Sequence, residues 1–146
     1  MARFHFPLEK VLRWRLVQLA AEEAKQKKLL QEQVQLQTLG AELGVEKSRL
    51  SSSLATLPDL RGDDLRAMTA YSLRLKRLAE TIAERTTRCE RNLTVQRKKY
   101  HDAQQRCRLL EELKARKLEE WRREQSRQLD ILASESYIAN WNRDRL

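Results

Sequence analysis

The stretch "SSSLATLPDLRGDD", residues 51–64, interrupts a sequence that is otherwise typical of helix. Pro58 disfavours helical geometry at the residue before it. Asp63 or Asp64 suits the N-cap of a following helix, where negative charge is favourable. A connection this short turns the chain back on itself. We therefore expect a first helix over about 7–57, a turn over about 58–64 and a second helix over about 65–140.

The composition supports long helices and excludes most other folds. The 146 residues include three glycines and two prolines, and 35% of them are charged. Sandwiches, barrels and α/β folds need turn residues at much shorter intervals. A chain rich in Leu, Ala, Glu, Gln, Lys and Arg is typical of coiled coil. The mean hydropathy of −0.76 leaves folding upon binding as an alternative, but regularly spaced leucines favour an all-α fold.

Both helices carry an apolar stripe with steps of three and four residues. In the first helix the stripe thins at "EEAKQKK", residues 22–28. In the second, an extra step of four near Ile82 indicates a stutter, and an eleven-residue spacing follows Cys107. The first stripe reads Leu8, Leu12, Leu16, Leu19, Leu36, Leu39, Leu43, Leu50, Leu54, Leu57. The second reads Met68, Tyr71, Leu75, Leu78, Ile82, Thr86, Cys89, Leu93, Gln96, Tyr100, Ala103, Cys107, Leu110.

Two striped helices joined by a short turn predict one antiparallel coiled-coil domain over residues 1–146. A turn near residue 60 places residue i opposite about residue 121 − i, so the second helix is the longer arm. Residues from about 114 onward are then left without an intramolecular partner. This overhang is rich in apolar side chains, and a lone helix of this kind exposes more apolar surface than soluble monomers usually show.

The opening segment "FHFPLEKVLRWR", residues 4–15, is expected at the same end as the overhang. Tryptophan is enriched at binding hot spots, although Trp14 has the alternative of packing across the coiled coil. We predict a partner-binding surface formed by Phe4, Phe6, Leu8, Leu12, Trp14, Leu118, Trp121, Leu129 and Leu132.

Catalytic and metal-binding motifs are not found in the sequence, so we expect no enzymatic activity, no cofactor and no metal site. His5 and His101 are interpreted as surface residues. Cys89 and Cys107 lie 18 positions apart on one predicted helix, a separation of about 27 Å. They cannot form a disulfide with each other. Their stripe positions predict small buried side chains in a reducing compartment.

The formal net charge of +9 invites an anionic partner. Basic side chains near "RKKYH", residues 97–101, are spread around the helix, and the aromatic residue among them, Tyr100, falls on the apolar stripe and offers no stacking platform. We therefore expect a solvated face, or one complementary to an acidic protein, and no nucleic-acid binding. The sequence contains no 18-residue apolar run and no signal-peptide core, which predicts a cytoplasmic protein.

Both ends of the chain resemble the flagellar export protein FliJ family. Its members open with an aromatic-basic-aromatic cluster and a Leu-x-x-Arg-like helix with a glutamate-rich continuation, and they close on a short Leu/Met-Asp-x-x-Ala/Ser signature. The last ten residues, "YIANWNRDRL", depart from that pattern. The opening positions here are Phe4, Phe6, Leu8, Val11, Leu12, Arg15, Glu22 and Glu23, and the closing ones are Leu129, Asp130, Ile131, Ala133 and Ser134.

This resemblance implies a cytoplasmic component of the flagellar type III export apparatus, peripheral at the inner face of the cell membrane through its partners. Such a monomer inserts into the hexameric ring of the export ATPase, promotes its assembly and activity, and also meets export chaperones. The turn end contacts the membrane-embedded export gate. The residues expected there are Leu50, Leu54, Leu60 and Leu65. The alternatives are a homo-oligomeric coiled-coil tether and a basic coiled coil associated with nucleic acid.

Overall fold

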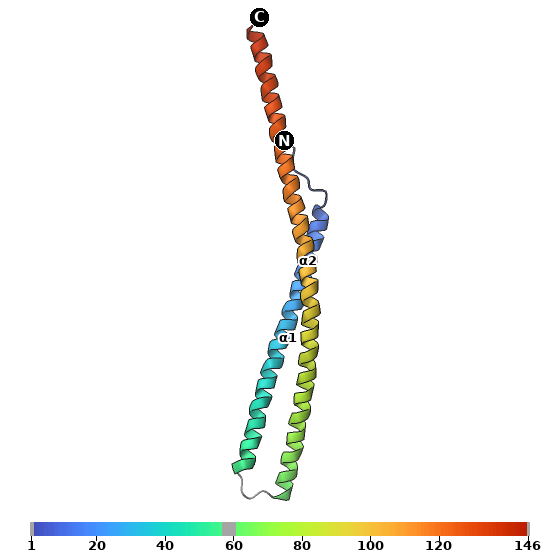
Figure 1. The fold of residues 1–146 in the computed structure, drawn as a ribbon, viewed down its shortest axis with the longest axis vertical. Helices are drawn as coiled ribbons and strands as arrows, with labels where there is room; N and C mark the ends of the chain where they lie inside the picture. Colours follow the sequence, from blue (N-terminus) through green and yellow to red (C-terminus); the bar gives the residue numbers. More distant parts are fainter. Residues whose placement is uncertain (1, 57–60, 146) are drawn as a thin grey trace. The chain divides into compact units, whose positions relative to one another are not determined.

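The computed structural model describes residues 2–56 and 61–145, which form two long α-helices. Helix α1 spans Glu9–Thr56 and helix α2 spans Gly62–Asp144. The two helices pack against each other as an antiparallel pair, and the described residues contain no strand (Figure 1). With 83 residues against 48, α2 is the longer helix. The predicted all-α fold with two helices of unequal length is confirmed.

The helix boundaries follow local chemistry. Pro7 and Leu8 form a turn in which the Glu9 amide donates to the carbonyl oxygen of Phe6 over 3.1 Å. Helix α2 begins at Gly62, earlier than predicted, so Asp63 and Asp64 lie inside its first turn. Negative charge is favourable there because the first amides of a helix point toward it. Residues 58–60 of the predicted turn lie outside the described residues, as does Leu57 at the predicted end of the first helix, and residues 62–64 belong to α2.

The contact face of α2 matches its predicted stripe from Ile82 to Leu110. Every stripe position in that range is buried or half-buried, and every residue between them is exposed. Nearer the turn the prediction is wrong, because Leu78 is 45% exposed and Ala79 is half-buried instead. The row through Ala79 alternates steps of three and four without interruption. The extra step of four that indicated a stutter is therefore not present.

The contact face of α1 differs more from its predicted stripe. Leu16, Leu39 and Leu54 are exposed, at 41%, 45% and 42%. Steps of four residues rotate a side chain beyond one full turn, whereas alternating three and four stays on one face. The structure keeps that alternation and places polar residues and a glycine inward. The less exposed row includes Leu12, Arg15, Leu19, Glu22, Gln26, Leu29, Gln33, Leu36, Gly40 and Leu43.

The chain forms two compact units, of which one comprises residues 20–101. Its core is a cluster of Leu36, Cys89 and Leu93, with Leu29 packed against it. The Cys89 thiol lies 3.4 Å from the carbonyl oxygen of Leu29, to which it donates. Burial raises the pKa of this thiol, which keeps it protonated and unreactive. The predicted buried, unpaired state of this cysteine is confirmed.

A polar layer crosses this unit where the first stripe thins. Gln96 is only 6% exposed, and its side-chain amide donates to the backbone carbonyl of Glu22 over 3.1 Å and to the Glu22 carboxylate. A buried amide is tolerated when its hydrogen bonds are made. Nearer the turn, the Tyr71 hydroxyl donates to Glu46 over 2.8 Å. These pairs lie within four residues of the predicted register.

The second unit comprises residues 1–19 and 102–146. Phe6, Leu12 and Cys107 are its buried side chains, at 4%, 5% and 3% exposure. Cys107 is a free cysteine, as predicted, and burial raises the pKa of its thiol. In this unit the opening segment and the start of α1 pack against the C-terminal half of α2.

Replacing Gly40 and Gly44 with alanine is expected to stabilise the protein. Both glycines lie inside α1, and a Cβ atom added at either position meets no neighbour within 4 Å. Glycine inside a helix costs about 0.8–1.0 kcal/mol relative to alanine. The double substitution should raise the thermal unfolding midpoint measured by circular dichroism. An unchanged or lower midpoint would show that the backbone at these positions departs from regular helix in solution.

Candidate partner-binding surfaces

The C-terminal part of α2 is a helix with exposed apolar side chains. Every residue from 126 to 145 is exposed, and this segment continues past the opening residues of the chain in Figure 1. Leu129 and Leu132 of the predicted surface are 65% and 57% exposed. Four further large apolar residues of the segment are 47–72% exposed: Ile131, Tyr137, Ile138 and Trp141.

These apolar side chains are not confined to one side of the helix. Successive residues of an α-helix are rotated by about 100°. Leu129 and Leu132 therefore point to one side, and Ile131 and Ile138 to the opposite side. The two aromatic residues, Tyr137 and Trp141, project between them. The apolar surface covers roughly three quarters of the circumference, and the remaining sector holds residues such as Gln128 and Ala139.

The predicted members from the opening segment divide into packed and exposed residues. Phe6 and Leu12 are buried, so they hold the segment against α2 and offer no surface to a partner. Leu8 and Trp14 are exposed, at 37% and 53%. Half-buried Phe4 and Trp121 contact each other, with ring centroids 6.0 Å apart. Tilted aromatic pairs at this separation are favourable, and this pair ties the chain start to α2. Leu118 is half-buried as well.

An ion pair joins the start of α1 to α2 in the same unit. Glu9 Oε2 lies 2.8 Å from Lys114 Nζ. The hydrogen bond from Lys114 keeps the pKa of the Glu9 carboxyl below its ordinary value of 4.5, although desolvation acts in the opposite direction. In the other unit, the Gln96 hydrogen bond keeps the pKa of Glu22 low in the same way. Both contacts stabilise the ionised carboxylate.

We expect the folded state to lose stability as the pH falls through 4.5 and below it. A carboxyl whose pKa is depressed on folding contributes stability above its unfolded pKa, and protonation removes that contribution. Glu9 and Glu22 are two such groups. The measurement is the thermal midpoint between pH 7 and pH 3 for the natural chain and for a Glu9→Gln, Glu22→Gln variant. The variant should show a shallower decline, and an equally steep decline would contradict these contacts.

The turn-end surface predicted for the gate is partly assembled in the structure. Leu54 and Leu65 both line a shallow hollow of about 340 Å³, together with Met68 and Leu73. The side chains of Leu54 and Leu65 are 42% and 47% exposed. Leu50 is half-buried and does not line the hollow. Leu60 lies outside the described residues.

Residues suited to chemistry are dispersed over the described chain. His5 and His101 are exposed, as expected for surface histidines. Among residues 2–56 and 61–145, no three His, Cys, Asp or Glu side chains come together as metal ligands. In that same part of the chain, neither helix has an apolar stretch long enough to cross a bilayer.

Some residues of these surfaces were not assigned to a site from the sequence. Ile131, Tyr137 and Ile138 fall off the stripe, which is why periodicity selects Leu129 and Leu132. Trp141 falls off the stripe too, but the enrichment of tryptophan at binding hot spots favours a binding role for it. The sequence feature that could have identified these residues is a cluster of irregularly spaced apolar side chains. It lies in the part of α2 that extends beyond the start of α1. For Met68 and Leu73, which line the turn-end hollow, no such feature exists, because nothing in the sequence predicts that hollow.

Comparison of the chain with known protein families, with curated proteins and with solved structures finds no match.

Proposed function

We propose that this protein is a non-enzymatic, FliJ-like component of a flagellar type III export apparatus. Its C-terminal helix enters the central opening of the hexameric export ATPase and promotes ring assembly and hydrolysis. The two ends of the sequence support this proposal through their resemblance to the family. The chain itself needs no cofactor for such a role, because it acts by contact.

The observation that carries the proposal is the distribution of apolar side chains around residues 126–145. A helix that pairs with one other helix needs a single apolar stripe. A helix that is apolar on most sides is stable when other protein surrounds it. Leu129, Ile138 and Trp141 project in three different directions, as the interior of a ring would require.

At the turn end, we propose that Leu54 and Leu65 contact the membrane-embedded export gate. They line an exposed apolar hollow there, and a partner side chain can bury itself in a hollow of this kind. The protein would then be cytoplasmic and would reach the membrane through its partners only. Contact with export chaperones belongs to the same proposal, and the resemblance alone supports it.

The test is to mix the protein with the cognate export ATPase. The rate of ATP hydrolysis is measured, and ring formation is followed separately by light scattering. We expect both to increase, with saturation near one molecule of this protein per six ATPase subunits. An ATPase whose activity and assembly state do not respond would refute the proposal.

A homo-oligomeric tether is the second candidate, because exposed Leu129 and Leu132 lie on one side of α2, as residues of a coiled-coil stripe do. Light scattering of the protein alone separates the two candidates. A monomer at micromolar concentration supports the ring-binding component, and a stable dimer supports the tether.

A further inference from the structure

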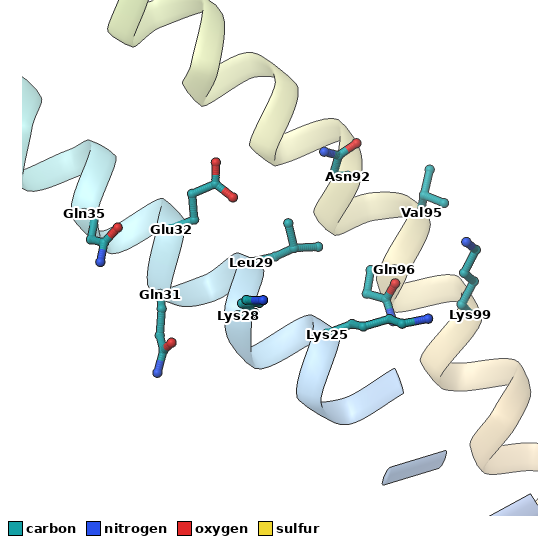
Figure 2. A pocket seen from close by; sticks show the side chains of 10 residues that line it. All are labelled: Lys25, Lys28, Leu29, Gln31, Glu32, Gln35, Asn92, Val95, Gln96 and Lys99. Atoms are coloured by element: carbon teal, nitrogen blue, oxygen red, sulfur yellow. The ribbon is translucent and has the colours of Figure 1, made fainter. Parts of the chain in front are cut away.

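A groove lies between the two helices of the unit formed by residues 20–101, far along each helix from its ends. It has a volume of about 720 Å³, which lies in the usual range for ligand sites. Residues between 25 and 35 of α1 line one side, and residues between 92 and 99 of α2 line the other (Figure 2). On the α1 side, Lys25 and Lys28 belong to the polar stretch at which the first apolar stripe thins.

Two apolar side chains, Leu29 and Val95, are among the residues that line this groove, and together they are called its floor. Leu29 points from α1 toward α2 in Figure 2 and packs against the core cluster. Val95 is 56% exposed. Leu29 comes from α1 and Val95 from α2, where its side chain projects away from α1 in Figure 2. A partner that fills the groove removes apolar surface of both helices from water.

The rim of the groove is basic. Lys25, Lys28 and Lys99 line it, against Glu32 as the one acid among the described lining residues. Lys25 Nζ lies 3.7 Å from a carboxylate oxygen of Glu22, which is a long and weak ion pair. In Figure 2 the Lys25 side chain extends from α1 toward α2. Lys28 and Lys99 have no ion pair within 4.0 Å among the described residues.

The dimensions of the groove suit a helix. The lining residues of α1 run from Lys25 to Gln35, which is about 15 Å at 1.5 Å per residue, or nearly three helical turns. On α2 the lining residues Asn92, Val95 and Lys99 are spaced by three and four, so they share one face. A groove between two helices with an apolar floor accepts the apolar face of a third helix.

We propose that this groove binds an acidic amphipathic helix of a partner protein. Apolar side chains of that helix cover Leu29 and Val95, and its carboxylates pair with Lys25, Lys28 and Lys99. The charge of the rim and the apolar floor together select this occupant. Duplex nucleic acid would use the lysines and leave the floor exposed. The inference does not rest on the proposed export function, because it concerns a different part of the chain.

The probe for this site is a fluorescently labelled, helix-stapled peptide of three turns. It carries leucines on one face and glutamates on both flanks of that face. Fluorescence anisotropy of this peptide is measured with the full-length protein at about 0.15 M salt. We expect saturable binding. The same peptide with lysine in place of every glutamate should bind at least tenfold more weakly.

Matched variants separate the groove from the general positive charge of the protein. The groove variant is Lys28→Glu with Lys99→Glu. The control is Lys27→Glu with Lys98→Glu, which makes the same change of charge at adjacent positions that do not line the groove. We expect the groove variant to weaken peptide binding about tenfold, equivalent to 1.4 kcal/mol, and the control to change it less than twofold.

Equal weakening in both variants would overturn the proposal, because it would indicate attraction by net charge alone. Substituting Val95→Asp should also weaken binding of the acidic peptide if its leucines contact the floor, and unchanged binding counts against the site. Two further results would overturn it. One is tighter binding of duplex DNA than of the peptide, and the other is a dimer of this chain that the groove variant dissociates.

Discussion

If the proposed function is correct, a variant with Leu129→Asp and Leu132→Asp should not stimulate an export ATPase as the natural chain does. Burying a leucine side chain in an interface contributes about 1.5–3 kcal/mol. Loss of two such contacts corresponds to a roughly 10²–10⁴-fold weaker association, and the introduced carboxylates add a desolvation cost. The measurement is hydrolysis rate as a function of the concentration of this protein. The variant should need at least a hundredfold higher concentration for half-maximal stimulation.

The matched control for this variant lies in the same helical segment. Gln128→Asp with Ala139→Asp adds the same two charges in the sector of the helix that carries no large apolar side chain, so no large apolar side chain is removed. This control should retain stimulation within a few-fold of the natural chain. Because all four positions are exposed, the thermal midpoints of both variants should stay close to that of the natural chain. Full stimulation by the Leu129→Asp, Leu132→Asp variant would exclude the C-terminal helix from the ring.

The largest expected effect on stability comes from Leu93→Ala in the core of residues 20–101. Leu93 is 2% exposed and belongs to the cluster with Leu36 and Cys89. Truncating a buried leucine to alanine typically costs about 2–5 kcal/mol, because burial is lost and a cavity remains. The free energy of unfolding is measured by urea titration with circular dichroism. Because this two-helix fold has few fully buried side chains, the free energy of unfolding should decrease by a clearly measurable amount.

Leu109→Ala is the control for this core substitution. It makes the same chemical change on the same helix, but Leu109 is 64% exposed. Its free energy of unfolding should stay within about 0.5 kcal/mol of the natural value. If both alanine variants lost equal stability, helix propensity or the unfolded state would govern the effect in place of core packing.

The sequence predicts the candidate ring-binding surface only in part. Leu129 and Leu132 were found because they continue the spacing of the stripe, and both are exposed on α2. The same predicted surface includes Phe6 and Leu12, yet both are buried. Apolar composition alone does not distinguish a residue that packs inside a unit from one that is exposed and available to bind a partner. Only the path of the opening segment along α2 decides between these uses.

The turn-end surface shows the same limit in another form. The spacing of the leucines predicts that Leu54 lies on the inward stripe of α1, but the structure shows it exposed and lining a hollow. The hollow also includes residues of α2, such as Leu65 and Met68, which lie more than ten positions after Leu54 in the sequence. A site made by two helices depends on how one is rotated against the other, and local periodicity does not contain that rotation.

The sequence by itself determined the two helices, their unequal lengths and the contact face of α2 from Ile82 to Leu110. These features depend on local backbone preferences and on the 3.6-residue period, which act within a single helix. Tertiary structure alone decided that Ala79 replaces Leu78 in the contact face and that Gln96 pairs with Glu22. Such choices follow from the partner helix. Packing maintains the alternating spacing of three and four residues along both contact faces, and this spacing brings polar or small residues into the contact.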